Sequence, residues 1–167
     1  DQLAVQTYPV QVIVADDAST DATAGVVAAI GDPRIRVVRL VANRGPGGAR
    51  NAGLAAATGR YVAILDADDT VHPERMKRLV ARLDKSGAQA IVDGQEVRRA
   101  DGSVTPMFTA GELDARPEIT LPDYVRGNLI FESSFNFGYL KPVFERSFIV
   151  EHAVAYPEDI RIGEDYQ

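Results

Sequence analysis

The chain has 167 residues, which is enough for one domain with a sizeable hydrophobic core. Hydrophobic residues make up 46% and charged residues 25% of it, as in ordinary soluble globular proteins. The net charge of −6 argues against nucleic acid as a partner, because phosphate binding needs a basic surface. The chain has no cysteine, which excludes disulfides and thiolate metal sites, and no apolar run approaches the roughly 20 residues of a membrane span.

The first half of the chain alternates expected strands with expected helices. Apolar, β-branched runs predict strands at residues 10–17, 35–41 and 61–65. Capping residues, helical spacing of apolar residues and terminal glycines predict helices at residues 19–31, in the alanine-rich segment ending at Gly59, and at residues 73–87. This alternation predicts an α/β fold in which helices flank a mostly parallel sheet.

The second half has a different pattern. Two extended runs around Asp101-Gly102 predict a hairpin, and residues 121–130 predict a short helix. Residues 135–154 predict a strand or loop followed by a helix. We therefore expect a single domain over residues 1–167, with one half at about 1–88 and a second half, with a hairpin and mixed strands, at about 89–167.

Two of the expected parallel strands end in carboxylates. Asp16 and Asp17 follow the first strand, and the sequence Asp66-Ala67-Asp68-Asp69 follows the third. Ligands of open α/β sheets bind beyond the carboxyl ends of the strands, so both clusters lie where a ligand is expected. Carboxylates at this spacing suit Mg²⁺ or Mn²⁺. The alternative interpretation is that these aspartates cap turns and helices.

Two further motifs have ambiguous chemistry on their own. The glycine-rich residues 45–48 begin like a dinucleotide fingerprint, but Arg50 replaces its third glycine and the loop follows the second strand. Glycines and an arginine at a helix N-terminus still suit a phosphate or nucleotide. Near the end of the chain, Glu164 and Asp165 follow a glycine, and in isolation this pattern is typical of a solvated acidic turn.

Three segments together carry a family resemblance. They are QTYPVQVIVADDASTDAT, then NRGPGGARNAGLAAATGRYVAILDADD, and GEDY nearly a hundred residues later. In this order they resemble the family 2 glycosyltransferases of GT-A fold over almost the whole chain. The resemblance implies that the half at about 1–88 is nucleotide-binding and the half at about 89–167 is acceptor-side. Because that family opens with a further strand and continues beyond the final motif, we expect this chain to be part of a longer protein, lacking the first strand and the C-terminal extension.

The resemblance implies roles for the residues of the donor site. Asp16 and Asp17 would help to hold the nucleotide. The Arg-Asn pair after the glycine-rich loop maps on Arg50 and Asn51, with Arg50 near the nucleotide.

It also implies a metal and a base. The Asp-x-Asp motif maps on Asp66, near the ribose, and Asp68, the expected ligand of Mn²⁺ or Mg²⁺. The Glu-Asp motif maps on Glu164, at the substrate, and Asp165, the expected catalytic base. We expect Asp69 to be structural.

The expected activity is that of an inverting, metal-dependent glycosyltransferase of the hexosyltransferase type. Its donor would be a nucleotide diphosphate sugar, with UDP the commonest carrier in the family, and its acceptor a saccharide or lipid-linked saccharide in bacterial polysaccharide biosynthesis. The expected location is cytoplasmic, at the membrane face if parts outside this chain associate with it. Two alternatives stay open: a non-catalytic nucleotide-sugar-binding domain and a nucleotidyltransferase. Lys141 is a candidate contact to acceptor or diphosphate, and His72 is expected to be structural.

Overall fold

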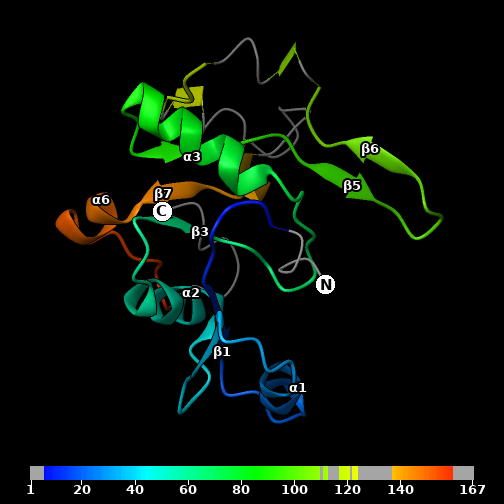
Figure 1. The fold of residues 1–167 in the computed structure, drawn as a ribbon, viewed down its shortest axis with the longest axis vertical. Helices are drawn as coiled ribbons and strands as arrows, with labels where there is room; N and C mark the ends of the chain where they lie inside the picture. The colour runs from blue at the N-terminus through cyan, green and yellow to red at the C-terminus, as the bar shows by residue number, and fades with distance from the viewer. Residues whose placement is uncertain (1–5, 110, 113–116, 121, 124–136, 160–167) are drawn as a thin grey trace. The chain divides into compact units, whose positions relative to one another are not determined.

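The computed structural model describes residues 6–109, 111–112, 117–120, 122–123 and 137–159. It divides the chain into two compact units, one of Asp1–Ala90 with Val143–Gln167 and one of Ile91–Pro142 (Figure 1). The sequence placed everything after about residue 88 in one half, whereas the structure returns the segment from Val143 onward to the first unit. The functional labels of the two halves remain predictions.

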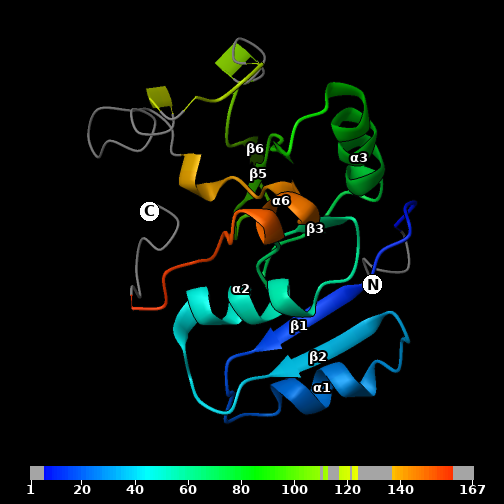
Figure 2. The same ribbon diagram turned by 90° about the vertical axis from the view of Figure 1, so that its left-hand side faces the viewer.

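The first unit contains a parallel pair of strands between two helices. β1 (Val12–Asp16) pairs with β2 (Ile35–Arg39), with Val12 opposite Ile35 and Asp16 opposite Arg39. Helices α1 (Thr23–Ala29) and α2 (Gly45–Ala56) lie on opposite faces of this pair (Figure 2). Because the strands are parallel, the end of β1, the end of β2 and the start of α2 come to the same edge.

A second sheet of the described chain has the strand order β3-β7-β4. β3 (Tyr61–Ala63) pairs antiparallel with β7 (Val143–Glu145), and β4 is Ala90–Ile91. β7 continues directly into helix α6 (Arg146–Glu151). The central strand of this sheet therefore comes from a part of the chain about 80 residues after β3, and Val143 in it is fully buried.

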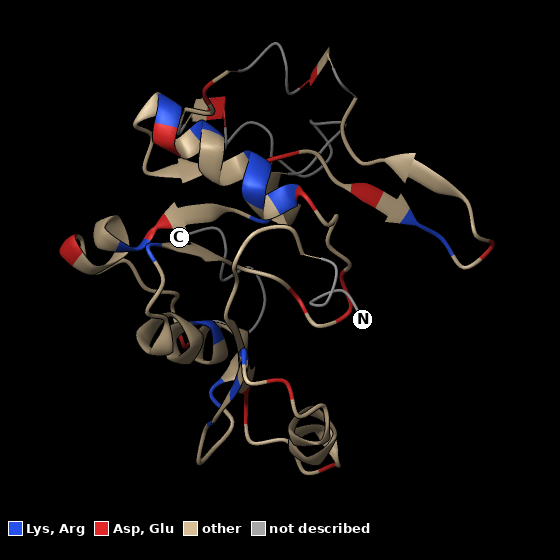
Figure 3. Ribbon diagram, in the orientation of Figure 1, with Lys and Arg blue, Asp and Glu red and all other residues tan. Residues whose placement is uncertain are grey.

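Helix α3 (Arg75–Ser86) is amphipathic, as the spacing of its apolar residues predicted. Leu79, Val80 and Leu83 are buried. Gly87 ends the helix in a left-handed conformation (φ 71°), and its N–H donates to the carbonyl of Leu83 at 3.0 Å. The basic residues of the helix stand out in Figure 3, and in sequence they are Arg75, Lys77, Arg78, Arg82 and Lys85.

In the second unit the hairpin that the sequence predicted is confirmed. β5 (Glu96–Arg98) pairs antiparallel with β6 (Val104–Pro106). Asp101 accepts a hydrogen bond from the Ser103 N–H at 2.8 Å, and Gly102 takes a positive φ of 83° that a turn of this kind requires. The unit also has a small core of its own, which consists of Phe108, Phe137 and Leu140. Phe137 belongs to the short 3₁₀ helix η1 (Phe137–Tyr139).

Two helix starts refine the sequence expectation. The sequence offered Ser19, Thr20 or Asp21 as the cap of α1, and the helix begins at Thr23, just after the last of these. The Asp21 carboxylate accepts both the N–H and the hydroxyl of Thr23, at 2.9 and 2.5 Å. α2 begins at Gly45, so the glycine-rich segment is its first turn rather than a loop before it. The helix expected at residues 121–130 lies largely outside the described residues. Within the described ranges, no helix is long and apolar enough to cross a membrane.

A polar cluster at the start of β3 gives a testable pH dependence. The Tyr61 hydroxyl donates to Asp84 at 2.7 Å, and burial together with this bond raises the pKa of Tyr61 to about 12. A raised pKa stabilises the fold below the unfolded value of about 10, and this contribution is lost as the pH rises through 10 to 12. We expect the urea unfolding free energy to fall more steeply over this range in the wild type than in Tyr61→Phe, while Tyr139→Phe, at an exposed position, follows the wild type.

Candidate functional site

Asp16 is a buried carboxylate at the end of β1, with 3% of its surface exposed. Its Oδ1 accepts the Ser19 N–H at 2.9 Å, and Oδ2 lies 3.4 Å from Nε of Arg39. Hydrogen bonds from Ser19, and then the charge of Arg39, hold the pKa of Asp16 below its usual value despite burial. Oδ2 has no hydrogen-bond partner among the described residues. Asp16 is therefore a buried carboxylate whose Oδ2 accepts no hydrogen bond from the described residues and lies beside the Arg39 guanidinium.

An open groove lies beside this residue at the ends of β1 and β2. It has a volume of about 680 Å³ and is lined by residues 18–21 and 39–41. Ala18 in its wall has a positive φ of 59°, a conformation that costs a non-glycine residue roughly 1 kcal/mol. Strained backbone of this kind is found preferentially at functional sites. The groove thus occupies the edge where the parallel strands predict a ligand.

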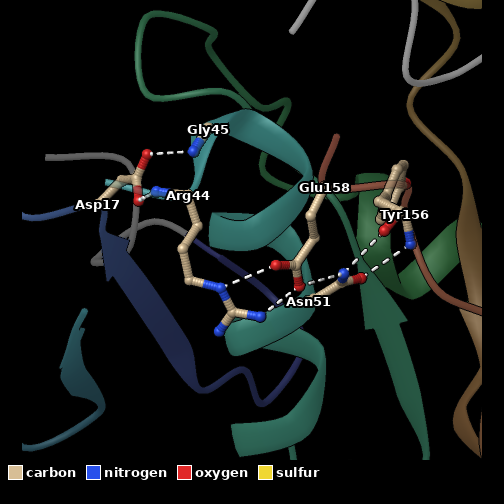
Figure 4. Close-up of polar contacts among 6 residues, drawn as sticks. All are labelled: Asp17, Arg44, Gly45, Asn51, Tyr156 and Glu158. Atoms are coloured by element: carbon tan, nitrogen blue, oxygen red, sulfur yellow. Dashed lines mark hydrogen bonds and ion pairs between the residues drawn. The ribbon is translucent and has the colours of Figure 1, made fainter. Parts of the chain in front are cut away.

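Asp17 joins the end of β1 to the start of α2. Its two carboxylate oxygens accept the N–H groups of Arg44 at 2.7 Å and Gly45 at 2.8 Å (Figure 4). These N–H groups have no partner within the helix, and the helix dipole favours a negative charge at this end. The capping interpretation therefore describes Asp17 in this structure, and its contact with a nucleotide stays a prediction.

Arg50 connects α2 to the carboxylates that follow β3. Its Nη2 lies 3.4 Å from Oδ1 of Asp66, and its guanidinium lies 5.2 Å from the centre of the Tyr156 ring. The N–H of Asp69 donates to the carbonyl of Asp66 at 3.2 Å, which closes a turn with Asp68 exposed at its tip. Two predicted site residues, Arg50 and Asp66, are thus in contact, and Asp68 is presented to solvent beside them.

The carboxylates after β3 fit one particular kind of metal site. Among the described residues, no group of three or more His, Cys, Asp or Glu side chains could hold an ion. One or two carboxylates are the usual protein contribution to a Mg²⁺ or Mn²⁺ ion whose other ligands are water and substrate phosphate. The exposed carboxylate of Asp68 fits this pattern, whereas Asp66 contacts Arg50. The residues present therefore fit an ion that arrives with a phosphorylated substrate, rather than a closed protein cage.

Asn51 contacts a distant segment, residues 154–158, which we call the strap. Its Oδ1 accepts the Tyr156 N–H at 2.8 Å, and its Nδ2 donates to the Tyr156 carbonyl at 2.8 Å and to Oε1 of Glu158 at 3.2 Å (Figure 4). These bonds use both amide hydrogens and one lone pair of the side chain. The structure thus shows Asn51 holding the strap, and the substrate contact expected of it stays a prediction.

Two further contacts fix the strap on α2. Arg44 forms a bidentate ion pair with Glu158, with Nε 2.8 Å from Oε2 and Nη2 on Oε1. Arg44, and then Asn51, hold the pKa of Glu158 below its usual value. Gly47 is buried against the strap, where a Cβ atom would overlap the carbonyl oxygen of Pro157. Arg44 and Glu158 are not recognisable from the sequence, because more than 100 positions separate them and no local pattern marks either one.

The remaining candidates have simpler outcomes. Glu164 and Asp165 lie outside the described residues. His72 is exposed, and its Nδ1 accepts the N–H of Glu74 at 3.2 Å, a local contact before α3 that agrees with a structural role. Lys141 belongs to the second unit, and its contact with a substrate stays a prediction.

The α/β fold and the strand-end site define a GT-A type of glycosyltransferase domain. The model of the glycosyl transferase family 2 matches residues 1–148, so the chain belongs to this family. It is 51% identical over 98% of its length to the succinoglycan biosynthesis protein ExoO of Rhizobium meliloti, and 34% identical over 93% to ExoU of the same organism.

A solved structure agrees with this assignment. TarS of Staphylococcus aureus, crystallised with UDP-GlcNAc, superposes with a TM-score of 0.69 at 25% identity over 98% of this chain and 45% of that one. The chain also spans about half of its curated relatives, 47% of ExoO and 46% of ExoU.

Proposed function

We propose that this chain carries the donor site of an inverting glycosyltransferase. The donor is a UDP-sugar and the acceptor a hydroxyl of a saccharide or lipid-linked saccharide, during bacterial polysaccharide biosynthesis. The names of ExoO and ExoU support the process, and the UDP-GlcNAc complex of TarS supports the donor class. We place the reaction in the cytoplasm, at the membrane when the acceptor is lipid-linked.

The observation that carries the proposal is the set of contacts around the first half of α2. Residues 44–51, at the start and middle of the helix, contact Asp17, which follows β1, Asp66 in the loop after β3, and the strap. Strand-end carboxylates, an arginine and a helix N-terminus gather at one edge, which is an arrangement that suits a nucleotide diphosphate.

Each of the candidate residues has its own role in donor binding. Arg50 supplies a positive charge near the phosphates. Asp66, the carboxylate that Arg50 contacts, accepts a hydrogen bond from a ribose hydroxyl. Asp68 would hold Mn²⁺ or Mg²⁺, which when bound offsets the negative charge that develops on the diphosphate. Glu164 contributes to the same substrate site.

Asp165 acts on the acceptor. As the acceptor oxygen bonds to the anomeric carbon and the bond from that carbon to the diphosphate oxygen breaks, Asp165 takes the hydroxyl proton. The base and the leaving group lie on opposite faces of the sugar, so the displacement is in line and inverts the anomeric configuration.

The proposal is tested with a panel of sugar nucleotides in the full-length protein. We expect UDP with Mn²⁺ to raise the melting temperature more than GDP or dTDP does, and a UDP-sugar to yield a glycosylated product with inverted configuration. A melting shift without transfer from any donor would favour a non-catalytic binding domain. Release of pyrophosphate from a nucleoside triphosphate and a sugar phosphate would favour a nucleotidyltransferase.

Asp68→Ala should weaken Mn²⁺-dependent UDP binding at least about tenfold, because the ion loses its exposed carboxylate ligand. Isothermal calorimetry with and without Mn²⁺ measures this directly. Asp69→Ala, the same change at the adjacent position, should keep the wild-type affinity. Equal UDP affinity of Asp68→Ala and wild type in the presence of Mn²⁺ would remove Asp68 from the metal site.

A further inference from the structure

We infer that the ring of Tyr156 holds the Arg50 guanidinium in place for the donor nucleotide, which makes Tyr156 a positioning residue of the donor site. This inference rests on the proposed function, since it takes Arg50 as the positive charge near the phosphates. The glycine-rich motif marks Arg50 in the sequence, whereas no local pattern marks Tyr156, which follows more than 100 positions later.

The guanidinium of Arg50 contacts both an aromatic ring and a carboxylate. Its Cζ lies over the Tyr156 ring, 5.2 Å from the ring centre, and its Nη2 lies 3.4 Å from Oδ1 of Asp66. A cation within about 6 Å of a ring centre is attracted by the negative charge of the π face. Only 18% of the Arg50 side chain is exposed, so salt and water screen these contacts less than at an open surface. The ring and the carboxylate together limit where the guanidinium can lie.

Tyr156 is held through its backbone, which leaves its ring to act on Arg50. The side chain of Asn51 accepts the Tyr156 N–H and donates to the Tyr156 carbonyl, each at 2.8 Å. Asn51 directly follows Arg50 in α2. The cation and the anchor of the ring therefore belong to adjacent residues of one helix, and a movement of that helix carries both along.

The two residues after Tyr156 are fixed on the same helix. Gly47 lets the Pro157 carbonyl oxygen approach α2 more closely than a residue with a Cβ would allow. Glu158 pairs with Arg44 in a bidentate contact, and such pairs fix geometry as well as attract. Three successive residues of the strap thus contact the first half of α2, which sets the position of the ring.

A positioned Arg50 favours donor binding for two physical reasons. Arginine has one of the most flexible side chains, and a side chain that is ordered before the ligand arrives loses less conformational entropy on binding. The ring also keeps water from part of the guanidinium, which strengthens its attraction to a phosphate. Loss of a cation–π contact of this kind should change the affinity roughly two- to fivefold.

The first test compares Tyr156→Leu with Tyr156→Phe in the full-length protein. Both variants keep the backbone groups that Asn51 binds, but only phenylalanine keeps an aromatic face. We expect Tyr156→Leu to weaken UDP binding in the presence of Mn²⁺ about two- to fivefold by calorimetry, and Tyr156→Phe to stay close to wild type. Tyr139→Leu, at an exposed position, is the matched control and should keep the wild-type affinity.

Arg50→Gln shows whether Tyr156 acts through Arg50. This change alone should weaken UDP binding, and adding Tyr156→Leu to it should cause no further loss, because the ring then has no cation to hold. An equal loss from Tyr156→Leu in the presence and absence of Arg50 would show that the ring acts on the nucleotide or on the fold by itself, which would overturn the inference.

The Nε–H proton resonance of Arg50 reports on the contact without any nucleotide. A proton over an aromatic face is shifted upfield, so the resonance that disappears in Arg50→Gln should lie upfield in wild type and Tyr156→Phe and lose this shift in Tyr156→Leu. An unchanged resonance in Tyr156→Leu would overturn the inference even if the UDP affinity fell.

The binding measurements separate this inference from the proposed function. If the wild type binds UDP with Mn²⁺ and Tyr156→Leu keeps its affinity, the positioning role is wrong although the proposed function stands. If the wild type binds no nucleotide, the proposed function and the positioning role fail together.

Discussion

Replacing Asp165 with Asn in the full-length protein should lower kcat by about 10²- to 10⁴-fold, because the acceptor hydroxyl loses the group that takes its proton. The amide has almost the same shape as the carboxylate, so the affinity for UDP and Mn²⁺ should change little. Steady-state transfer rates and calorimetry on the same preparation measure the two effects separately.

Asp159→Asn is the matched control for this variant. It makes the same chemical change six residues earlier, at an exposed position outside the strap, and should leave kcat unchanged. Transfer by Asp165→Asn at near the wild-type rate would remove Asp165 from the mechanism.

The second large effect is expected on stability. Gly47→Ala should lower the free energy of unfolding by about 1–3 kcal/mol, because the new methyl group overlaps the carbonyl oxygen of Pro157 and a backbone atom cannot turn away as a side chain can. The same displacement of the strap moves the Tyr156 ring and should lower the affinity for UDP. Urea denaturation at neutral pH measures the first effect.

Gly53→Ala, in the same helix, is expected to raise the free energy of unfolding instead of lowering it. Its Cβ would lie 3.9 Å from the Cβ of Ala15, an ordinary contact, so the variant should gain about 0.5–1 kcal/mol from the better helix propensity of alanine. If both variants changed stability in the same direction and by the same amount, helix propensity rather than contact with the strap would explain Gly47.

Most elements of the first 90 residues follow from local sequence patterns. β-branched apolar runs predicted β1 and β2, and the helical spacing of apolar residues with a terminal glycine predicted α3. Each of these signals acts over a few residues of sequence. The hairpin of the second unit was expected for the same reason, since Asp101-Gly102 selects its turn. Helix starts were less well predicted, because a single side chain such as Asp21 decides where the first N–H groups bond.

The site was only partly visible in the sequence. Strand-end carboxylates and Arg50 belong to recognisable motifs, and the structure brings Arg50 to Asp66. Capping by Asp17 was one of the two interpretations that the sequence left open, but the helix that it caps was not visible, and neither were the contacts of Asn51, because each depends on which backbone groups lie nearby. Their partners, the start of α2 and the strap, are 28 and 105 positions away in the chain.

The sequence by itself therefore determined the family and the α/β class, and it supplied the candidate residues of the donor site. Only the tertiary structure decided that the segment after Val143 returns to the first unit and that Arg44 meets Glu158 across more than 100 positions. The physical reason is that periodicity and turn chemistry act between near neighbours, while an ion pair or a close backbone approach is set by packing. The Arg44–Glu158 pair exists because α2 and the strap pack together, with glycine at the point where they touch.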